Sequence, residues 1–153
     1  MIISSGAISD LVKEIRRETR ICASKAESTD TGTLTYDSIY SDLNNVEGAK
    51  LDIGTGLFTA GMAGVYQVSY NMQLVSDPGQ EHTVWVTVNG ANVAESLVHS
   101  AVDNNEYEAS TDNGGRVIMV KLGQWDTVGL THQTTGTRPV NKISFCVSSV
   151  MLQ

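Results

Sequence analysis

The chain has 153 residues, of which 41% are hydrophobic and 18% charged, and its 17 acidic against 10 basic residues give a formal net charge of −7. A chain of this size forms one domain with a core of its own, and the low charged fraction excludes a disordered protein or a coiled-coil rod. The negative charge makes nonspecific binding to nucleic acid or anionic membranes unfavourable. No apolar run approaches the roughly 20 residues of a membrane span.

The N-terminal segment is predicted to form one amphipathic helix over Ile8–Arg20. Its apolar residues recur at helical spacing, namely Ile8, Leu11, Val12 and Ile15. A helix this short is marginal alone in water, so its apolar stripe must pack on the domain or on the same helix of another subunit. We therefore divide the chain into a helical segment, residues 1–21, and a globular domain, residues 22–153.

The first residues do not resemble a signal peptide. Met1–Gly6 lacks a basic start and an apolar segment. The chain is therefore either the mature part of a secreted protein or a protein that is not exported by that route.

After Ile21 the hydrophobic pattern changes to the alternation of β-strands. The predicted strands are Thr33–Tyr40, Gly64–Met72, Val84–Asn89, Val93–Val98, Val117–Leu122, Thr127–Thr131 and Ile143–Leu152. Together with shorter runs they make about nine or ten strands at spacings near 8–12 residues, which predicts an all-β antiparallel sandwich or jelly roll.

The segments between the predicted strands have the chemistry of turns and loops. Asp52–Gly56 and Asn89-Gly90 are predicted turns, and Asp103–Gly115 is a polar, acidic segment predicted to be a loop. Gly123–Asp126 separates two alternating runs, so Val117–Leu122 and Thr127–Thr131 are predicted to pair as a hairpin.

No arrangement of residues in the sequence predicts a catalytic site, so we expect a protein that is not an enzyme. His82, His99 and His132 form no H-x-H or H-E-x-x-H pattern, and there is neither a G-x-S-x-G motif nor a glycine-rich phosphate loop. Cys22 and Cys146 are far apart and form no C-x-x-C motif. They are either two buried thiols or one bridge between the first and last strands.

Four segments, in order, resemble the motifs of the complement C1q globular-head family. Leu51–Ala60 looks like Y-D-x-x-T-G-x-F-T-A/C, and Gly64–Tyr70 is similar to G-V-Y-x-F-S-Y. Thr33–Tyr40 resembles x-F-D-x-V-x-x-N, and Gly115–Leu130 is similar to G-G-x-V-x-L-x-L-x-x-G-D-x-V-W-L. The resemblance runs from about residue 22 to 153, nearly the whole chain after the predicted helix.

The resemblance implies a ten-stranded jelly roll of the C1q and tumour-necrosis-factor type that assembles as a homotrimer. In such a fold the first and last strands are neighbours, so Cys22 and Cys146 can face each other. The residues expected in the core or the subunit interface are Phe58, Tyr66, Val68 and Val84.

The sequence departs from the family pattern at several positions. It has no Gly-X-Y triplets, and Val147–Val150 stands where the family has F-S-G-F. Trp125-Asp126 replaces the family's Gly-Asp, which places a tryptophan at a predicted hairpin tip. That side chain is either exposed for binding or folded against the next subunit.

The resemblance also implies calcium as a possible cofactor, held by acidic loop residues near the top of the trimer. The matching carboxylates are Asp103, Glu106, Glu108 and Asp112, and the alternative is a solvated acidic loop. For ligand binding it implies aromatic and planar polar groups of the kind that glycans contact. The candidates are Trp125, Tyr107, His99, His132, Arg116 and Arg138, and the alternative is solvated surface.

These expectations combine into a secreted, extracellular C1q-domain protein with a homotrimeric head. Its predicted function is lectin-like pattern recognition in innate immunity, by binding glycans or microbial envelope molecules. Three weak sites on one trimer gain avidity on a repetitive surface. The alternatives are a trimeric signalling ligand for a protein receptor and a calcium-associated extracellular matrix protein. No nucleic-acid partner and no membrane span are expected.

Overall fold

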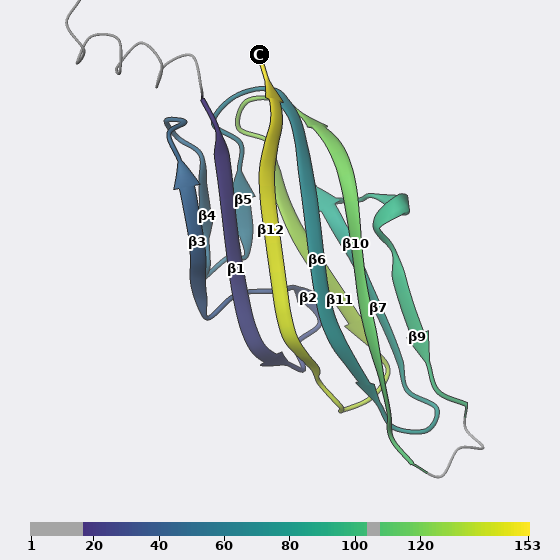
Figure 1. The fold of residues 1–153 in the computed structure, drawn as a ribbon. Coiled ribbons are helices and arrows are strands. Elements are labelled where there is room, and N and C mark those ends of the chain that lie inside the picture. Colours follow the sequence, from purple (N-terminus) through teal and green to yellow (C-terminus); the bar gives the residue numbers. More distant parts are fainter. Residues whose placement is uncertain (1–16, 104–107) are drawn as a thin grey trace, which may run out of the picture.

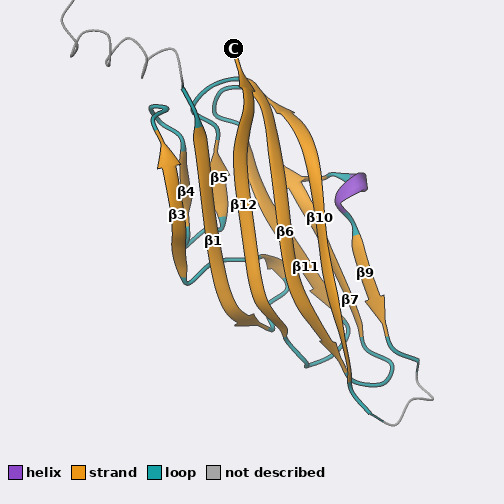
Figure 2. Ribbon diagram, viewed as in Figure 1, coloured by secondary structure: helices purple, strands orange, loops and turns teal. Residues whose placement is uncertain are grey.

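The structure, a computed structural model, describes residues 17–103 and 108–153, and in them two antiparallel β-sheets pack face to face (Figures 1 and 2). One sheet has five strands in the order β10-β6-β12-β1-β3, and the other has seven, with the path β4-β5-β11-β7-β8, β2 pairing with β11 and β9 with β7. The strands are β1 Thr19–Ser28, β2 Gly32–Thr33, β3 Ser38–Asn44, β4 Lys50–Asp52, β5 Leu57–Thr59, β6 Gly64–Ser76, β7 Glu81–Val88, β8 Ala91–Asn92, β9 Val98–Ala101, β10 Ser110–Leu122, β11 Thr127–Thr134 and β12 Val140–Leu152. A single 3₁₀ turn, η1, covers Ala94–Ser96 in the described part.

The core lies between the two sheets and follows from the alternation in the sequence. Along β6, residues Tyr66, Val68 and Tyr70 are buried while the residues between them point to the other side of the sheet. Phe58 of β5 lies against Tyr66 with ring centroids 5.9 Å apart. Phe58, Tyr66, Val68 and Val84 are all fully buried, which confirms the expectation that they form the core.

The two cysteines form a disulfide on directly opposed positions of β1 and β12. Cys22 pairs with Cys146 in the ladder, with their Cα atoms 4.1 Å apart. The Tyr40 hydroxyl lies 2.7 Å from Ser144 Oγ and 3.3 Å from Cys146 Sγ. Of the two alternatives open from the sequence, the structure has the bridge between the first and last strands.

The predicted N-terminal helix is wrong at its C-terminal end. Thr19 and Ile21 belong to β1, where both are buried, and Thr19 pairs with Asn44 of β3. Burial of these alternate positions favours a strand over one more helical turn. The part of the predicted helix before Arg17 lies outside the described residues, and the domain boundary at residue 21 falls inside a strand.

The segment Thr33–Tyr40 is not one strand, because it connects the two sheets. Thr33 ends β2, which pairs with β11, whereas Ser38 begins β3, which pairs with β1. Between them Leu34 and Tyr36 enter the core, and the Tyr36 ring stacks on Phe145 at 5.5 Å. The alternation continues through this crossing, so the sequence pattern does not show it.

Three further predictions are corrected by the sheet topology. Val93–Val98 is mostly the 3₁₀ turn before β9, and the predicted loop Asp103–Gly115 already enters β10 at Ser110. The predicted hairpin does not form, since β10 pairs with β6 in one sheet and β11 pairs with β5 and β7 in the other. The connection Gly123–Asp126 therefore crosses from sheet to sheet.

The described part contains twelve strands rather than ten, two of them only two residues long.

Replacing both cysteines by alanine should lower the free energy of unfolding by about 2–5 kcal/mol, because the bridge closes a loop that spans 124 positions of the sequence. Guanidinium unfolding of the oxidised protein and of the double variant would measure this. The reduced wild-type protein is the control and should match the variant. Equal stability of all three forms would contradict the structural role of the bridge.

Candidate functional site

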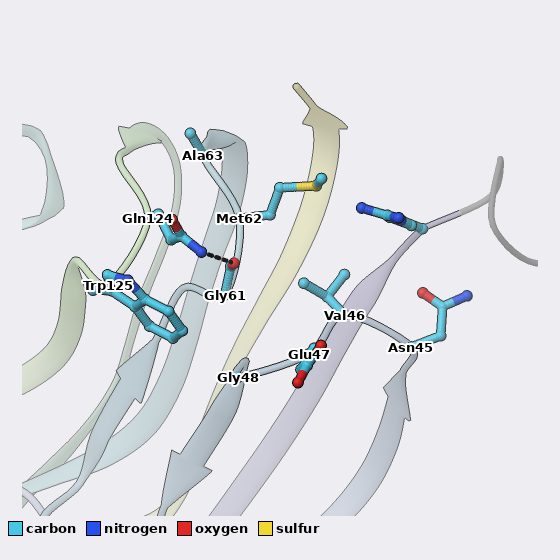
Figure 3. A pocket seen from close by; sticks show the side chains of 10 residues that line it. Asn45, Val46, Glu47, Gly48, Gly61, Met62, Ala63, Gln124 and Trp125 are labelled. Atoms are coloured by element: carbon cyan, nitrogen blue, oxygen red, sulfur yellow. Dashed lines mark hydrogen bonds between the residues drawn. The ribbon is translucent and has the colours of Figure 1, made fainter.

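One cavity lies at the end of the sandwich that carries the C-terminus, and Figure 3 shows it from close by. It has a volume of about 840 Å³ and is open to solvent. Three connections line it: Asn45–Gly48 between β3 and β4, Gly61–Ala63 between β5 and β6, and Gln124-Trp125 between β10 and β11. Arg17, just before β1, completes the lining. We call this the Trp125 pocket.

Trp125 occupies a tight turn that presents the indole at the surface. Its backbone has a φ of 73°, a left-handed conformation uncommon for a bulky residue. Its amide N–H donates to Ala60 O at 2.7 Å, and the Ala60 N–H donates to Asp126 O at 2.9 Å. These bonds hold the turn against the end of β5 and leave the tryptophan 58% exposed. The exposed indole beside the cavity is available for contact with a ligand or with another chain.

Asp126 fixes the other side of the same turn. Its carboxylate accepts hydrogen bonds from Asn89 Nδ2 at 3.0 Å and from the Gly123 N–H at 2.7 Å. The Asn89 hydrogen bond, then the Gly123 bond, lowers the pKa of Asp126, so the carboxylate is ionised at neutral pH. Asn89 also accepts the Thr127 N–H at 2.9 Å. The hairpin tip between β7 and β8 and the Trp125 turn are therefore joined.

Glycines let the connections approach each other. A Cβ at Gly48 would lie 2.6 Å from the Trp125 ring, and a Cβ at Gly61 would lie 2.4 Å from Glu47 O. A Cβ atom does not come this close to a nonbonded heavy atom in real proteins. The indole ring of Trp125 therefore packs directly against the backbone of Gly48, with no side chain between them.

Side chains of the fold anchor the pocket walls. Gln124 Nε2 donates to Gly61 O at 3.2 Å, and the hydroxyl of the buried Tyr66 ring donates to Met62 O at 2.5 Å. Burial raises the pKa of Tyr66, which keeps this hydroxyl a donor. On the other wall, Asn44 Nδ2 donates to Ala49 O at 2.7 Å and Asn44 Oδ1 accepts the Val46 N–H at 3.0 Å. The pocket is thus preformed by the sandwich.

The pocket combines an aromatic surface with groups that form directed hydrogen bonds. Trp125, Val46 and Met62 supply apolar area, while Glu47 and Gln124 supply a carboxylate and an amide. The apolar face of a sugar ring can stack on an indole while planar polar groups bond its hydroxyls. The arrangement therefore suits a small polyhydroxylated ligand.

Apart from Trp125, the predicted ligand residues do not gather at this pocket. His99 lies on β9, with Nε2 3.8 Å from Glu81 Oε2, and Arg138 Nε bonds Asp77 Oδ1 at 2.9 Å. Arg116 is exposed on β10, and Tyr107 lies outside the described residues. His132 is fully buried inside β11, so this candidate side chain is not accessible to a ligand at the surface.

The predicted calcium ligands form no cluster in the described part of the chain. Residues 17–103 and 108–153 contain no group of three or more His, Cys, Asp or Glu side chains that could hold a metal ion. Asp112 instead accepts a hydrogen bond from Ser100 Oγ at 2.7 Å. Glu106 lies outside the described residues, while Asp103 and Glu108 lie within them. Calcium binding stays a prediction.

The sequence reasoning missed most of the Trp125 pocket. Glu47, Met62 and Gln124 belong to three separate connections, and no local pattern marks them as one site. The available signal was the pair of glycines, Gly48 and Gly61, of which Gly61 lies just before the predicted strand Gly64–Met72. Only the strand order brings these turns to the same end of the sandwich.

Comparison with known proteins rests on the fold. No family model and no curated protein matches the sequence. Among solved structures, the globular domain of a zebrafish complement 1qA protein is similar, with a TM-score of 0.57 over 89% of this chain and 99% of that chain. The sequence identity is 18%. The protein has the fold of a C1q globular domain. Within this C1q fold, no helix among the described residues is long and apolar enough to cross a membrane.

Gly48→Ala should destabilise the C1q fold and displace the indole of Trp125, because the new Cβ would overlap the ring. Gly90→Ala is the matched control, since Gly90 has the same φ of 82° but a Cβ added there would have no atom within 4 Å. We expect Gly48→Ala to cost about 1–3 kcal/mol more than Gly90→Ala in denaturant unfolding, with a shifted Trp125 indole N–H resonance. Equal costs would mean that the ring does not rest on Gly48.

Proposed function

We propose that the protein is an extracellular recognition protein of the C1q type, without enzymatic activity, that binds glycans or similar molecules of microbial surfaces in the Trp125 pocket. The observation that carries this proposal is the exposed indole, held in a left-handed turn above a preformed cavity of about 840 Å³. Exposing the indole to water costs more free energy than burying it, so its exposure beside the cavity is best explained by a ligand that covers it.

The disulfide supports an extracellular location. Bridges between cysteines persist in oxidising compartments and are rare in the cytosol. Cys22 and Cys146 are joined in this chain, and no free cysteine is present among the described residues. A protein that meets microbial surfaces works in such a compartment.

A homotrimeric head is the proposed assembly, supported by the C1q fold and by the outward face of the five-stranded sheet. Val117 and Met119 lie exposed on β10 at one edge of this sheet, and Tyr40 and Leu43 lie exposed on β3 at the other. Apolar side chains at both edges of one face suit contact with further copies of the chain. Three pockets held together would convert weak single contacts into avidity.

Trp125→Ala should reduce the affinity for the glycan about two- to tenfold, since the stacked ring contributes about 0.5–1.5 kcal/mol and a tenfold change corresponds to about 1.4 kcal/mol. A glycan array at fixed protein concentration, with calcium and with chelator, would identify the ligand and test for a calcium requirement. Isothermal titration with that glycan then compares the variants.

Leu97→Ala is the control for this experiment, because Leu97 is also large, apolar and exposed but does not line the pocket. Its affinity should equal that of the wild-type protein. Equal binding by Trp125→Ala would place the ligand elsewhere. An array without any signal would overturn the glycan proposal and favour a protein receptor or a matrix role.

Light scattering should give a mass three times that of the 16.4 kDa chain, and Met119→Lys should shift it toward a single chain, because the new charge would be buried between subunits. Leu97→Lys, which places the same charge elsewhere on the exposed surface, should leave the trimer intact. A wild-type mass of one chain would contradict the assembly without affecting the glycan test.

A further inference from the structure

Two histidines lie in contact inside the sandwich, at the end away from the C-terminus. His82 of β7 and His132 of β11 are both 0% exposed, and their ring centroids are 5.2 Å apart. His82 Nδ1 lies 2.9 Å from His132 Nε2, the distance of a hydrogen bond. The proposed recognition function does not use this pair.

The two outer ring nitrogens of the pair both face backbone carbonyls. His82 Nε2 lies 2.6 Å from Val75 O, and His132 Nδ1 lies 2.8 Å from Asp30 O. A carbonyl oxygen only accepts hydrogen bonds. Each of these outer nitrogens must therefore carry a hydrogen.

The Gln80 amide also lies near an outer nitrogen but does not change this assignment. Gln80 Nε2 lies 3.3 Å from His82 Nε2, but closer acceptors take its two hydrogens: Thr134 Oγ1 at 2.8 Å and Arg138 O at 3.0 Å. The amide orientation is fixed because Gln80 Oε1 accepts the N–H groups of Asp77 and Arg138. His82 Nε2 is thus the donor to Val75 O.

The contact between His82 Nδ1 and His132 Nε2, the two inner nitrogens, then needs one more hydrogen. With both outer nitrogens protonated, two neutral rings would place two lone pairs 2.9 Å apart. One hydrogen between them makes three hydrogens on four nitrogens, which is one imidazolium and one imidazole. We propose that His82 and His132 share a single proton in the folded protein, and that its release is a pH-sensitive device at this end of the sandwich.

The groups around the pair act in both directions on a positive charge there. Burial lowers the pKa of His132 through desolvation, and a charge on His82 lowers it further, whereas the Asp30 carbonyl and carboxylate raise it. The loop between β6 and β7 adds Asp77, already paired with Arg138 of the connection before β12. Beside His82 in the ladder, β9 places Ser100, which donates to Asp112 of β10. The net charge of −7 also favours one buried cation.

Loss of the shared proton would loosen four segments at once. The pair connects Asp30, in the connection between β1 and β2, through β11 and β7 to Val75 of β6. Without the inner hydrogen, one ring must turn away from its neighbour. That ring then gives up its carbonyl as well, so this end of the sandwich opens as pH rises.

The sign of the pH dependence follows from the number of bound protons. Unfolded histidines titrate near pH 6.5, so above about pH 7.5 the unfolded pair holds no proton while the folded pair holds one. Stability then falls as pH rises, with the unfolding constant increasing about tenfold per pH unit. Below about pH 6 the unfolded pair holds two protons and the folded pair one, so stability falls as pH falls. The maximum lies between these limits.

Nitrogen-detected NMR of the histidine rings, recorded from pH 5 to 9 on the protein with its disulfide intact, tests the proposal. The half-exposed His99 serves as the internal reference. At pH 8 we expect His82 Nε2 and His132 Nδ1 both to carry hydrogens, with one further proton between the two rings. Two rings that are both neutral at pH 8 would overturn the proposal.

Variants extend the test to stability. His132→Gln should abolish the tenfold change in the unfolding constant per pH unit above pH 7.5, whereas His99→Gln should retain it. Retention of the full pH dependence in His132→Gln would also overturn the proposal. Should that variant fail to fold, the NMR measurement on the unaltered protein decides on its own.

Discussion

The packing of alternate side chains between two sheets is the constraint on which the rest of this structure depends. Tyr66, Val68 and Tyr70 of β6 can reach the opposite sheet only while the ladder with β12 and β10 keeps its register, since a slip of one residue would turn them to solvent. The ladder of β1 with β12 sets Cys22 opposite Cys146, and the ladder of β7 with β11 brings His82 beside His132. A bridge and a buried polar contact thus both follow from the placement of apolar residues.

The candidate site uses this rigidity without belonging to the core. Its three connections begin and end on strands that are paired within the two sheets. The hydroxyl of Tyr66 extends from the core and donates a hydrogen bond to the backbone carbonyl of Met62. The glycines at positions 48 and 61 then allow the connections to touch. Binding loops carried on a fixed scaffold lose little conformational freedom when a ligand arrives. A ligand in the Trp125 pocket would therefore lose little binding free energy to the ordering of these loops.

Local patterns in the sequence predict the class of fold and its core, because alternation in a strand depends on neighbouring residues. They do not predict the sheet to which each strand belongs. Leu34 and Tyr36 continue the alternation while the chain crosses between sheets, and Gly123–Asp126 has the chemistry of a hairpin but makes a crossing. From the sequence His132 is a candidate ligand residue, and its burial is not predicted because it depends on His82, which is 50 positions away. Trp125 is unusual from the sequence alone, yet the residues around it are brought together only by topology.

The bond between the first and last strands has a mechanical consequence. Thr19 and Ser149 are also in contact beside it, through the Thr19 N–H and the Ser149 hydroxyl, so both ends of the described chain leave the sandwich close together. Tension applied between these ends passes through the covalent bridge from β1 to β12 and bypasses the residues between the two cysteines, which are 124 positions apart. Pulling on the two ends therefore cannot separate β1 from β12, which lie side by side inside the five-stranded sheet.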